Sequence, residues 1–298
     1  MPVEPNGGVR PRVDRTTKIL FLHIPKTAGM SLNGLLVRNY RGKKQFNAEI
    51  ARTTPEAWQQ CLDRLRNTSP EELEQIAVVK GHFIFGLHDL LPGPSTYITF
   101  LRDPVKRLIS HYNMIKRGEG IPADHQLDPT RADWNLGTWP DFLRTLDNYQ
   151  TRAISGRDFD VPFGACNEEH LALAKENLDR HFAFVGITEQ FDLSLTALRR
   201  TLGWKMRFYV PDNVAPDRSP KPAPDVIDAL HRLNSLDAEL YRYGCERLAK
   251  LTEKSGWDLR AEVGLYRVGN QLHRQLHHSR HRLKRLLGLE RRPAIGSS

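Results

Sequence analysis

Cysteine and long apolar runs are scarce in this sequence of 298 residues. Its three cysteines, Cys61, Cys166 and Cys245, are far apart and form no C-x-x-C pair, which argues against a disulfide framework and favours a reducing compartment. No stretch approaches the roughly 18 apolar residues that a membrane-spanning helix needs. The N-terminus also lacks the apolar segment of a signal peptide. These absences predict a cytoplasmic protein.

Two familiar phosphate-binding signatures are missing as well. The sequence contains neither G-x-x-x-x-G-K-[ST] nor G-x-G-x-x-G. It also has no cluster of histidine, cysteine and carboxylate residues at metal-ligand spacing, so we expect no metal cofactor. Any phosphate site in this chain must therefore use a different anion-binding loop.

Positive charge is concentrated at the C-terminal end. The formal net charge is +9, and from Arg260 onward nine basic residues stand against two acidic ones, which leaves only +2 for everything before. The main domain is therefore not expected to bind nucleic acid. The basic segment is also amphipathic, with one apolar face formed by Leu265, Val268, Leu272, Leu276, Leu283 and Leu286. Such a helix can lie on an anionic membrane, bind a polyanionic acceptor, pair with another subunit or remain solvated.

Short apolar runs alternate with helical periodicity along most of the chain. This alternation predicts an α/β fold with a parallel central sheet flanked by helices. The expected organisation is a flexible tail over 1–16, one domain over 17–252 and a basic C-terminal helix and tail over 253–298. The expected strands are 18–23, 76–80, 96–101 and 182–186. The expected helices are 30–40, 55–66, 70–75, one starting at 104, 138–147, 149–155, 167–180, 193–202, 223–233, 235–252 and 259–287.

The first strand leads into a loop with the properties of an anion site. Residues 18–23 are apolar, residues 24–29 form a short loop, and a helix is expected to follow. Such a loop presents unpaired backbone N–H groups and the positive end of a helix dipole, to which phosphate binds readily. Lys26 adds a positive charge, and the hydroxyls of Thr27 and Ser31 are possible donors. An ordinary turn after a buried strand is the simpler alternative.

The sequence His-Ile-Pro-Lys-Thr-Ala-Gly-x-Ser at 23–31 resembles the 5'-phosphosulfate loop of the PAPS-dependent carbohydrate sulfotransferases. PAPS is 3'-phosphoadenosine-5'-phosphosulfate, and the resemblance is strongest to the group that includes the heparan sulfate 2-O-sulfotransferases. It implies a P-loop-like three-layer fold. The family has Thr where this sequence has Met30, so we expect weaker donor binding rather than loss of function. The residues implied to bind the 5' end are Pro25, Lys26, Thr27, Ala28, Gly29, Met30 and Ser31.

A second segment strengthens the resemblance. Residues 99–112 resemble the family's 3'-phosphate site, Arg-Asp-Pro-x-x-Arg-x-x-Ser-x-Tyr, and imply that Arg102 and Ser110 bind that phosphate. An arginine fork matches phosphate geometry. Residues 217–221 resemble the loop that folds over the nucleotide, with Arg218 and Lys221 as further contacts. A solvated loop is the alternative there.

The resemblance also assigns the catalytic groups. The family places a Gly-His pair where this chain has Gly81 and His82, and it implies that His82 takes the proton of the acceptor hydroxyl. Lys26 would stabilise the charge that develops on the bridging oxygen. His88 and His111 are rival bases. Arg152 is a candidate for the acceptor site, although an ion pair would explain it equally well.

The expected activity is in-line transfer of a sulfuryl group from PAPS to a hydroxyl, with a glycan or glycolipid as the expected class of acceptor. Two alternatives remain open. A kinase-like phosphotransferase would need a Walker lysine and a carboxylate for magnesium, which the sequence does not offer. A non-catalytic relative would bind the nucleotide or a glycan without turnover, and Met30 is the feature that favours it.

Overall fold

The computed structural model describes residues 13–48, 54–116, 147–205, 208–209, 222–253 and 256–286. Three sequence-based expectations lie outside these ranges: the helix at 138–147 and the nucleotide contacts Arg218 and Lys221. Most of the expected N-terminal tail also lies outside them.

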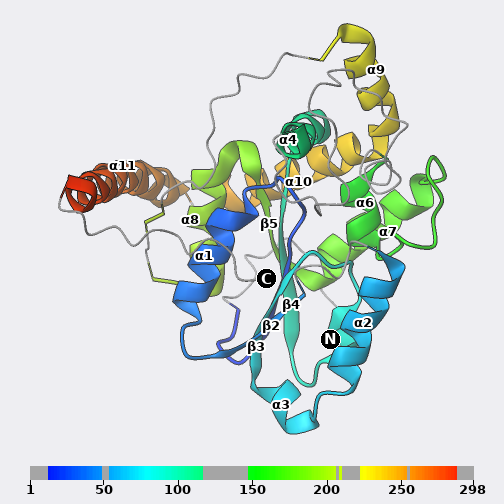
Figure 1. The fold of residues 1–298 in the computed structure, drawn as a ribbon, viewed down its shortest axis with the longest axis horizontal. Coiled ribbons are helices and arrows are strands. Elements are labelled where there is room, and N and C mark those ends of the chain that lie inside the picture. Colours follow the sequence, from blue (N-terminus) through cyan, green and yellow to red (C-terminus); the bar gives the residue numbers. More distant parts are fainter. Residues whose placement is uncertain are drawn as a thin grey trace.

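A parallel sheet of five strands forms the centre of the molecule, in the order β2-β3-β1-β4-β5 (Figure 1). The expected α/β class is therefore confirmed. Every residue of β1 is buried, as its uninterrupted apolar sequence requires in a central parallel strand. The strands are β1 (Lys18–Leu22), β2 (Lys44–Asn47), β3 (Ile76–Gly81), β4 (Ser95–Leu101) and β5 (Phe182–Ile187).

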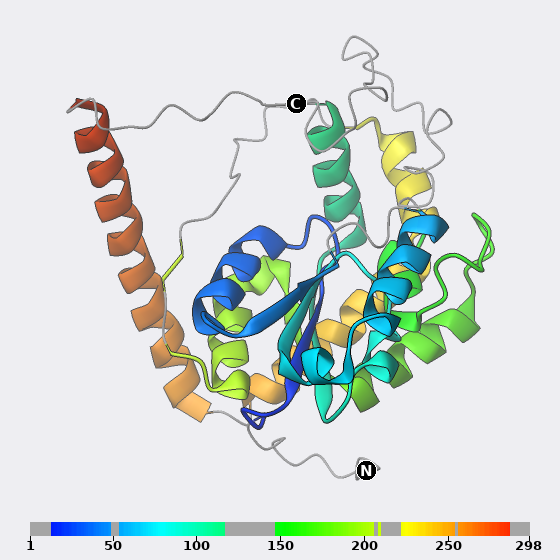
Figure 2. The same ribbon diagram turned by 60° about the horizontal axis from the view of Figure 1, so that its bottom comes forward.

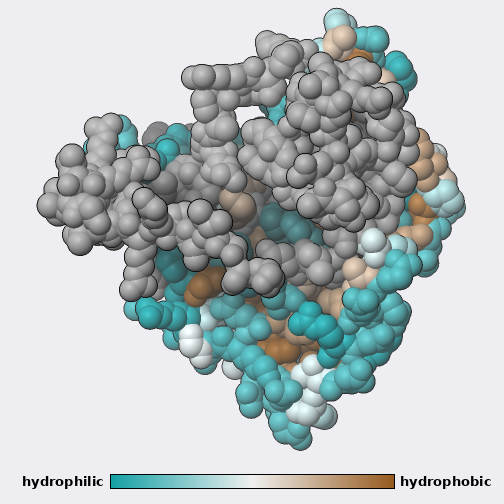
Figure 3. All heavy atoms as spheres, in the orientation of Figure 1, coloured by the Kyte–Doolittle hydropathy of each residue, from teal (hydrophilic) through white to brown (hydrophobic). Residues whose placement is uncertain are grey.

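Helices cover both faces of this sheet. In Figure 1, α1 and α8 lie on one side, and α2, α6 and α7 lie on the other. The α-helices are α1 (Gly29–Asn39), α2 (Pro55–Arg66), α3 (Pro70–Gln75), α4 (Pro104–Lys116), α6 (Tyr149–Ser155), α7 (Glu168–His181), α8 (Phe191–Leu202), α9 (Pro224–Leu233), α10 (Ser235–Glu253) and α11 (Gly256–Leu286). Short 3₁₀ turns occur at η1 (Leu87–Leu90) and η3 (Thr188–Gln190). Hydrophilic residues cover most of the visible surface over α2 and α3 (Figure 3).

The order of the strands determines where a ligand can bind. From β1 the chain moves to β2 and β3 on one side, and it then returns to β4 and β5 on the other. In parallel α/β sheets, ligands bind beyond the carboxyl ends of the strands at such a reversal. His23, His82 and Arg102 directly follow β1, β3 and β4, which are neighbours in the sheet. The fold therefore brings all three residues to the same edge.

The C-terminal helix α11 packs against the domain along one side, mainly in its first half. Leu259, Val263, Tyr266 and Asn270 are buried. The apolar face expected from the sequence is not the attached side of the helix: Leu265, Val268, Leu272 and Leu276 are all exposed. Figure 2 shows that the rest of α11 extends away from the domain. Within the described residues, every helix is too short or too polar to cross a bilayer.

Candidate active site

The loop after β1 has an unusual backbone. Lys26 and Ala28 have φ values of 70° and 62°, in the left-handed region that residues other than glycine rarely adopt. Ala28 is the N-cap of α1 and provides no side-chain hydrogen bond to the helix. The first N–H groups of a helix have no partner within it, so this uncapped end is suited to an anion. Backbone strain of this kind is often found at functional sites.

Thr27 corrects one sequence-based expectation. Its side chain is only 1% exposed, and its hydroxyl donates to the carbonyl of Ile24 at 2.8 Å. The hydroxyl therefore stabilises the turn, and it is not available as the phosphate donor that we expected. Ser31 is partly exposed, and Met30, at 50%, is exposed.

Arg102 connects the two motifs, whose residues Lys26 and Arg102 are 76 positions apart in the sequence. Its Nη1 donates to the backbone carbonyl of Lys26 at 2.8 Å. The Nε is buried without a hydrogen bond, and the nearest carboxylate oxygen, on Glu189, is 4.0 Å away. Burial lowers the pKa of Arg102, and Glu189 opposes that shift. The tips of β1 and β4 thus lie side by side, with a cationic side chain between them.

Two histidines meet at the ends of β1 and β3. The His23 N–H donates to the carbonyl of Gly81 at 2.9 Å, and the rings of His23 and His82 stack with centroids 4.3 Å apart. The Nδ1 of His82 lies 2.8 Å from the carbonyl oxygen of His23. A carbonyl can only accept, so Nδ1 carries the proton and donates it. The neutral ring then has its lone pair on Nε2, which is the form that a general base needs.

Positive charge collects around these rings. Burial lowers the pKa of His23 well below its usual value, and charges on His82 and Lys26 lower it further. Burial also lowers the pKa of His111 to about 3, with contributions from Arg107, Lys26 and His82. Burial and the nearby charges therefore keep His23 and His111 neutral beside Lys26.

The rival bases occupy different positions. The His88 Nδ1 shares a hydrogen bond with the Tyr97 hydroxyl at 2.9 Å. The centroid of the His88 ring lies 4.7 Å from that of the His181 ring. Tyr97 lies in the amino-terminal half of β4, and His181 ends α7 just before β5 begins, so His88 is remote from the carboxyl ends of the strands. His111 is at the correct edge, but its low pKa reflects an enclosed environment. Of the three, His82 is best placed at the strand tips.

Comparison with known proteins gives the family. Residues 10–244 match the Sulfotransferase family over most of the chain. The chain belongs to this family.

Individual relatives are distant. Human heparan-sulfate 6-O-sulfotransferase 1 is 27% identical over 266 residues, covering 76% of this chain and 64% of that protein. Galactosylceramide sulfotransferase from Bos taurus is 26% identical over 303 residues, covering 91% of this chain and 65% of that protein. The chain thus spans less than two thirds of the length of either relative. Neither is a 2-O-sulfotransferase, so the expected closeness to that group has no support from them.

A solved structure was also matched. It is a sulfotransferase from Alicyclobacillus acidocaldarius, 15% identical, with a TM-score of 0.41, covering 78% of this chain and 96% of that one.

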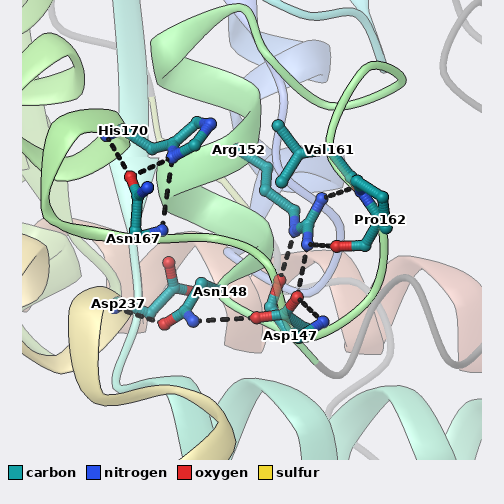
Figure 4. A network of polar contacts seen from close by, with 9 residues as sticks. Asp147, Asn148, Arg152, Val161, Pro162, Asn167, His170 and Asp237 are labelled. Atoms are coloured by element: carbon teal, nitrogen blue, oxygen red, sulfur yellow. Dashed lines mark hydrogen bonds and ion pairs between the residues drawn. The ribbon is translucent and has the colours of Figure 1, made fainter.

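Arg152 of α6 lies in a buried network of polar contacts (Figure 4). It pairs with Asp147, and both side chains are 3% exposed. Its Nε donates to the Asp147 carbonyl at 2.8 Å, and its Nη atoms donate to the carbonyls of Val161 and Pro162 at 2.5 and 2.7 Å. These bonds favour the ion-pair alternative over contact with an acceptor.

Two residues to which the sequence assigned no role hold Arg102 in place. The Gln150 side chain bonds to both the N–H and the carbonyl of Arg102, at 3.0 and 2.9 Å. Asp237 of α10 accepts from the N–H groups of Gln150 and Thr151 and from the Thr151 hydroxyl, at 3.0, 2.7 and 2.8 Å. A buried carboxylate thus caps α6, which in turn positions Arg102. The segment 148–152 also resembles the family in sequence, which is a signal for Gln150 and none for Asp237.

Replacing Arg152 by Met is expected to lower the free energy of unfolding by about 3–5 kcal/mol, because it leaves Asp147 buried without its partner. Denaturant unfolding measures the change. The matched control is Arg66→Met, which removes a pair whose side chains are 53% and 51% exposed and should cost less than about 1 kcal/mol. Unchanged stability with a raised acceptor KM would instead place Arg152 in the acceptor site.

His111 should make the stability of this chain sensitive to acid. Its pKa falls from 6.5 to about 3 on folding, so between these values the unfolded chain binds more protons, and stability is lost as the pH falls. The loss from this group should reach about 1–2 kcal/mol at pH 5. Unfolding of His111→Gln across pH 7 to 4 should show a shallower slope than the wild type. His231→Gln, at an exposed position, should keep the wild-type slope; equal slopes for both variants would contradict the assignment.

Proposed function

We propose that this chain is an O-sulfotransferase that transfers the sulfuryl group of PAPS to a hydroxyl of a carbohydrate acceptor. The observation that carries the proposal is the hydrogen bond from Arg102 to the Lys26 carbonyl at 2.8 Å. It joins the two phosphate motifs at one edge of the sheet, next to His82. Family membership gives the same reaction class independently.

The residues at this edge suit a donor with a phosphate at each end. The uncapped amino end of α1, Lys26 and Ser31 would hold the 5' group. Arg102 has a buried Nε without a hydrogen bond, which a phosphate oxygen would satisfy, and Ser110 is partly exposed on the next helix. When bound, PAPS supplies an activated sulfuryl group whose leaving group is the nucleotide bisphosphate.

The protein's part in the reaction follows from its protonation states. The His82 Nε2 accepts the hydroxyl proton of the acceptor. The Nδ1–H of His82 remains hydrogen-bonded to the His23 carbonyl, so the ring keeps its orientation as it becomes charged. The ammonium of Lys26 stabilises the negative charge that develops on the bridging oxygen. Proton removal and leaving-group stabilisation are thus performed by residues from two adjacent strands.

Met30 is the feature that favours the second candidate, a relative that binds the nucleotide without turnover. Its exposed, apolar side chain stands in the first turn of α1, where the family has a hydroxyl. We expect weaker binding of PAPS, since one side-chain hydrogen-bond donor to its phosphate is lost. The backbone N–H groups of that turn do not depend on the side chain.

The acceptor class is proposed from the relatives, whose names refer to heparan sulfate and galactosylceramide. A glycan or a glycolipid hydroxyl is therefore the first choice. Among the hydroxyls of heparan sulfate, the 6-O position is the first to test, because the first of these relatives is a 6-O-sulfotransferase.

A transfer assay with ³⁵S-labelled PAPS tests the proposal. The acceptor panel should contain heparan sulfate, 2-O- and 6-O-desulfated heparins, galactosylceramide and small alcohols. We expect labelled product from at least one sugar acceptor and none from γ-³²P-ATP. Phosphoryl transfer from ATP would establish the kinase-like alternative, and PAPS binding without product on any acceptor would favour the non-catalytic one.

A further inference from the structure

An exposed apolar stripe runs along α11. Leu265, Val268, Leu272 and Leu276 are 71%, 59%, 55% and 63% exposed. Their spacing of three or four residues places them on one side of the helix, over a length of about 16 Å. Four aliphatic side chains of this size in a row are unusual on a surface that contacts only water.

The stripe takes no part in attaching α11 to the domain. The attached side carries Val263, Tyr266 and Asn270, which are 7%, 3% and 1% exposed. The Asn270 Oδ1 accepts from the Tyr209 N–H at 2.8 Å, and the Tyr266 ring stacks on that of Phe208 at 5.8 Å. At 3.6 residues per turn, the stripe points roughly away from this attached side. A function other than packing is therefore needed to explain it.

Every Asp, Glu, Lys or Arg position around the stripe carries positive charge. Residues 263–286 contain no Asp or Glu and six basic residues: Arg267, Arg274, Arg280, Arg282, Lys284 and Arg285. The last acidic residue before them is Glu262, which pairs with Arg199 and Arg200 of α8. The partner of this helix should therefore be anionic as well as apolar.

These two properties distinguish among the partners. A second copy of α11 would bring two acid-free basic segments together, with no carboxylates to form interhelical pairs. A polyanionic glycan would match the charge but leave the four aliphatic side chains in water. An anionic bilayer offers both an acyl region for the stripe and charged headgroups for the basic residues.

We propose that α11 lies in the plane of an anionic lipid surface, with Leu265, Val268, Leu272 and Leu276 inserted between the headgroups. Arg267 pairs with Asp192 at 3.2 Å, and Arg274 lies over the Tyr209 ring at 5.5 Å, so both are held by the domain. Electrostatic attraction then depends mainly on the basic cluster at 280–285, which follows the stripe in sequence. This inference does not depend on the proposed catalysis.

Vesicle flotation with the full chain tests it. The probes are vesicles of phosphatidylcholine with 30% phosphatidylserine and vesicles of phosphatidylcholine alone. The chain should bind the anionic vesicles and release from them in 0.5 M NaCl. Leu265→Ser with Leu272→Ser should lower the partition coefficient by about tenfold or more, since each leucine loses its apolar contact with the bilayer. Val37→Ser is the matched control, because Val37 is 43% exposed on α1, away from the stripe.

A charge variant, in which the four basic residues at 280–285 become Gln, should lose binding to the anionic vesicles in the same assay. Absence of binding by the wild type, or equal binding by the double leucine variant, overturns the proposal. So does a dimer in sedimentation that the leucine variant dissociates without any vesicle binding. Binding to heparin but not to vesicles would assign the helix to a polyanion instead. Helical circular dichroism of each variant shows that α11 is retained.

Discussion

His82→Ala should reduce sulfuryl transfer by about 10²–10⁴-fold, the usual contribution of a general base. Affinity for adenosine 3',5'-bisphosphate should change by less than about threefold, because the groups proposed to hold its two phosphates lie in the loop after β1, in α1, directly after β4 and in α4. The Nδ1–H bond to His23 keeps the lone pair on Nε2, so the alanine variant removes the proton acceptor and little of the nucleotide site. Labelled transfer and equilibrium titration measure the two effects separately.

The matched control is His88→Ala, which removes a histidine next to Tyr97, away from the strand tips. It should retain transfer within about threefold per folded molecule. Imidazole added to His82→Ala should restore part of the rate if the residue acts as a base, since a free base can occupy the vacated space. Full turnover in His82→Ala would show that another group takes the proton, and His111 would then be the next to test.

Much of the fold could be predicted from local patterns. The starts of α2 and α3 were predicted correctly, at residues 55 and 70, and the structure shows that Thr54 and Ser69 cap these two helices, whose first residue is proline. Strand β2 was missed: in Lys44–Asn47 only Phe46 is buried, so this edge strand has no apolar run to reveal it. Helix α11 was expected, but its attached face was not, because Tyr266 and Asn270 do not stand out beside the stronger leucine pattern.

The candidate site was predictable where it depends on consecutive residues and not where it depends on distant pairs. Both phosphate motifs follow strands, which put Lys26 and Arg102 at one edge of the sheet. Gln150 and Asp237, which support Arg102, are 87 residues apart and share no pattern in the sequence. The role of the Thr27 hydroxyl was wrong for a related reason: whether it faces the ligand or the loop depends on the turn's backbone angles.

Gly29→Ala is expected to cost about 1–3 kcal/mol of stability and about 10²-fold in transfer. A Cβ at this position would lie 1.7 Å from the His23 Nε2 and 2.0 Å from its Cδ2, far inside any real contact. The ring has little room to move, because it stacks between Phe21 at 5.2 Å and His82 at 4.3 Å. Relief therefore requires a shift of the loop or of His82, and displacements of about 1 Å at catalytic groups can cost this much in rate.

A matched substitution on the same helix separates this clash from a general effect of losing glycine. Gly34 has no atom within 4 Å of an added Cβ, so Gly34→Ala should keep full transfer and add about 0.5–1 kcal/mol of stability through helix propensity. The double variant His23→Ala with Gly29→Ala should be more stable than the sum of the two single effects, since truncating the ring makes room for the Cβ. Additive free energies in thermal and denaturant unfolding would mean that the His23 ring is not what makes glycine necessary there.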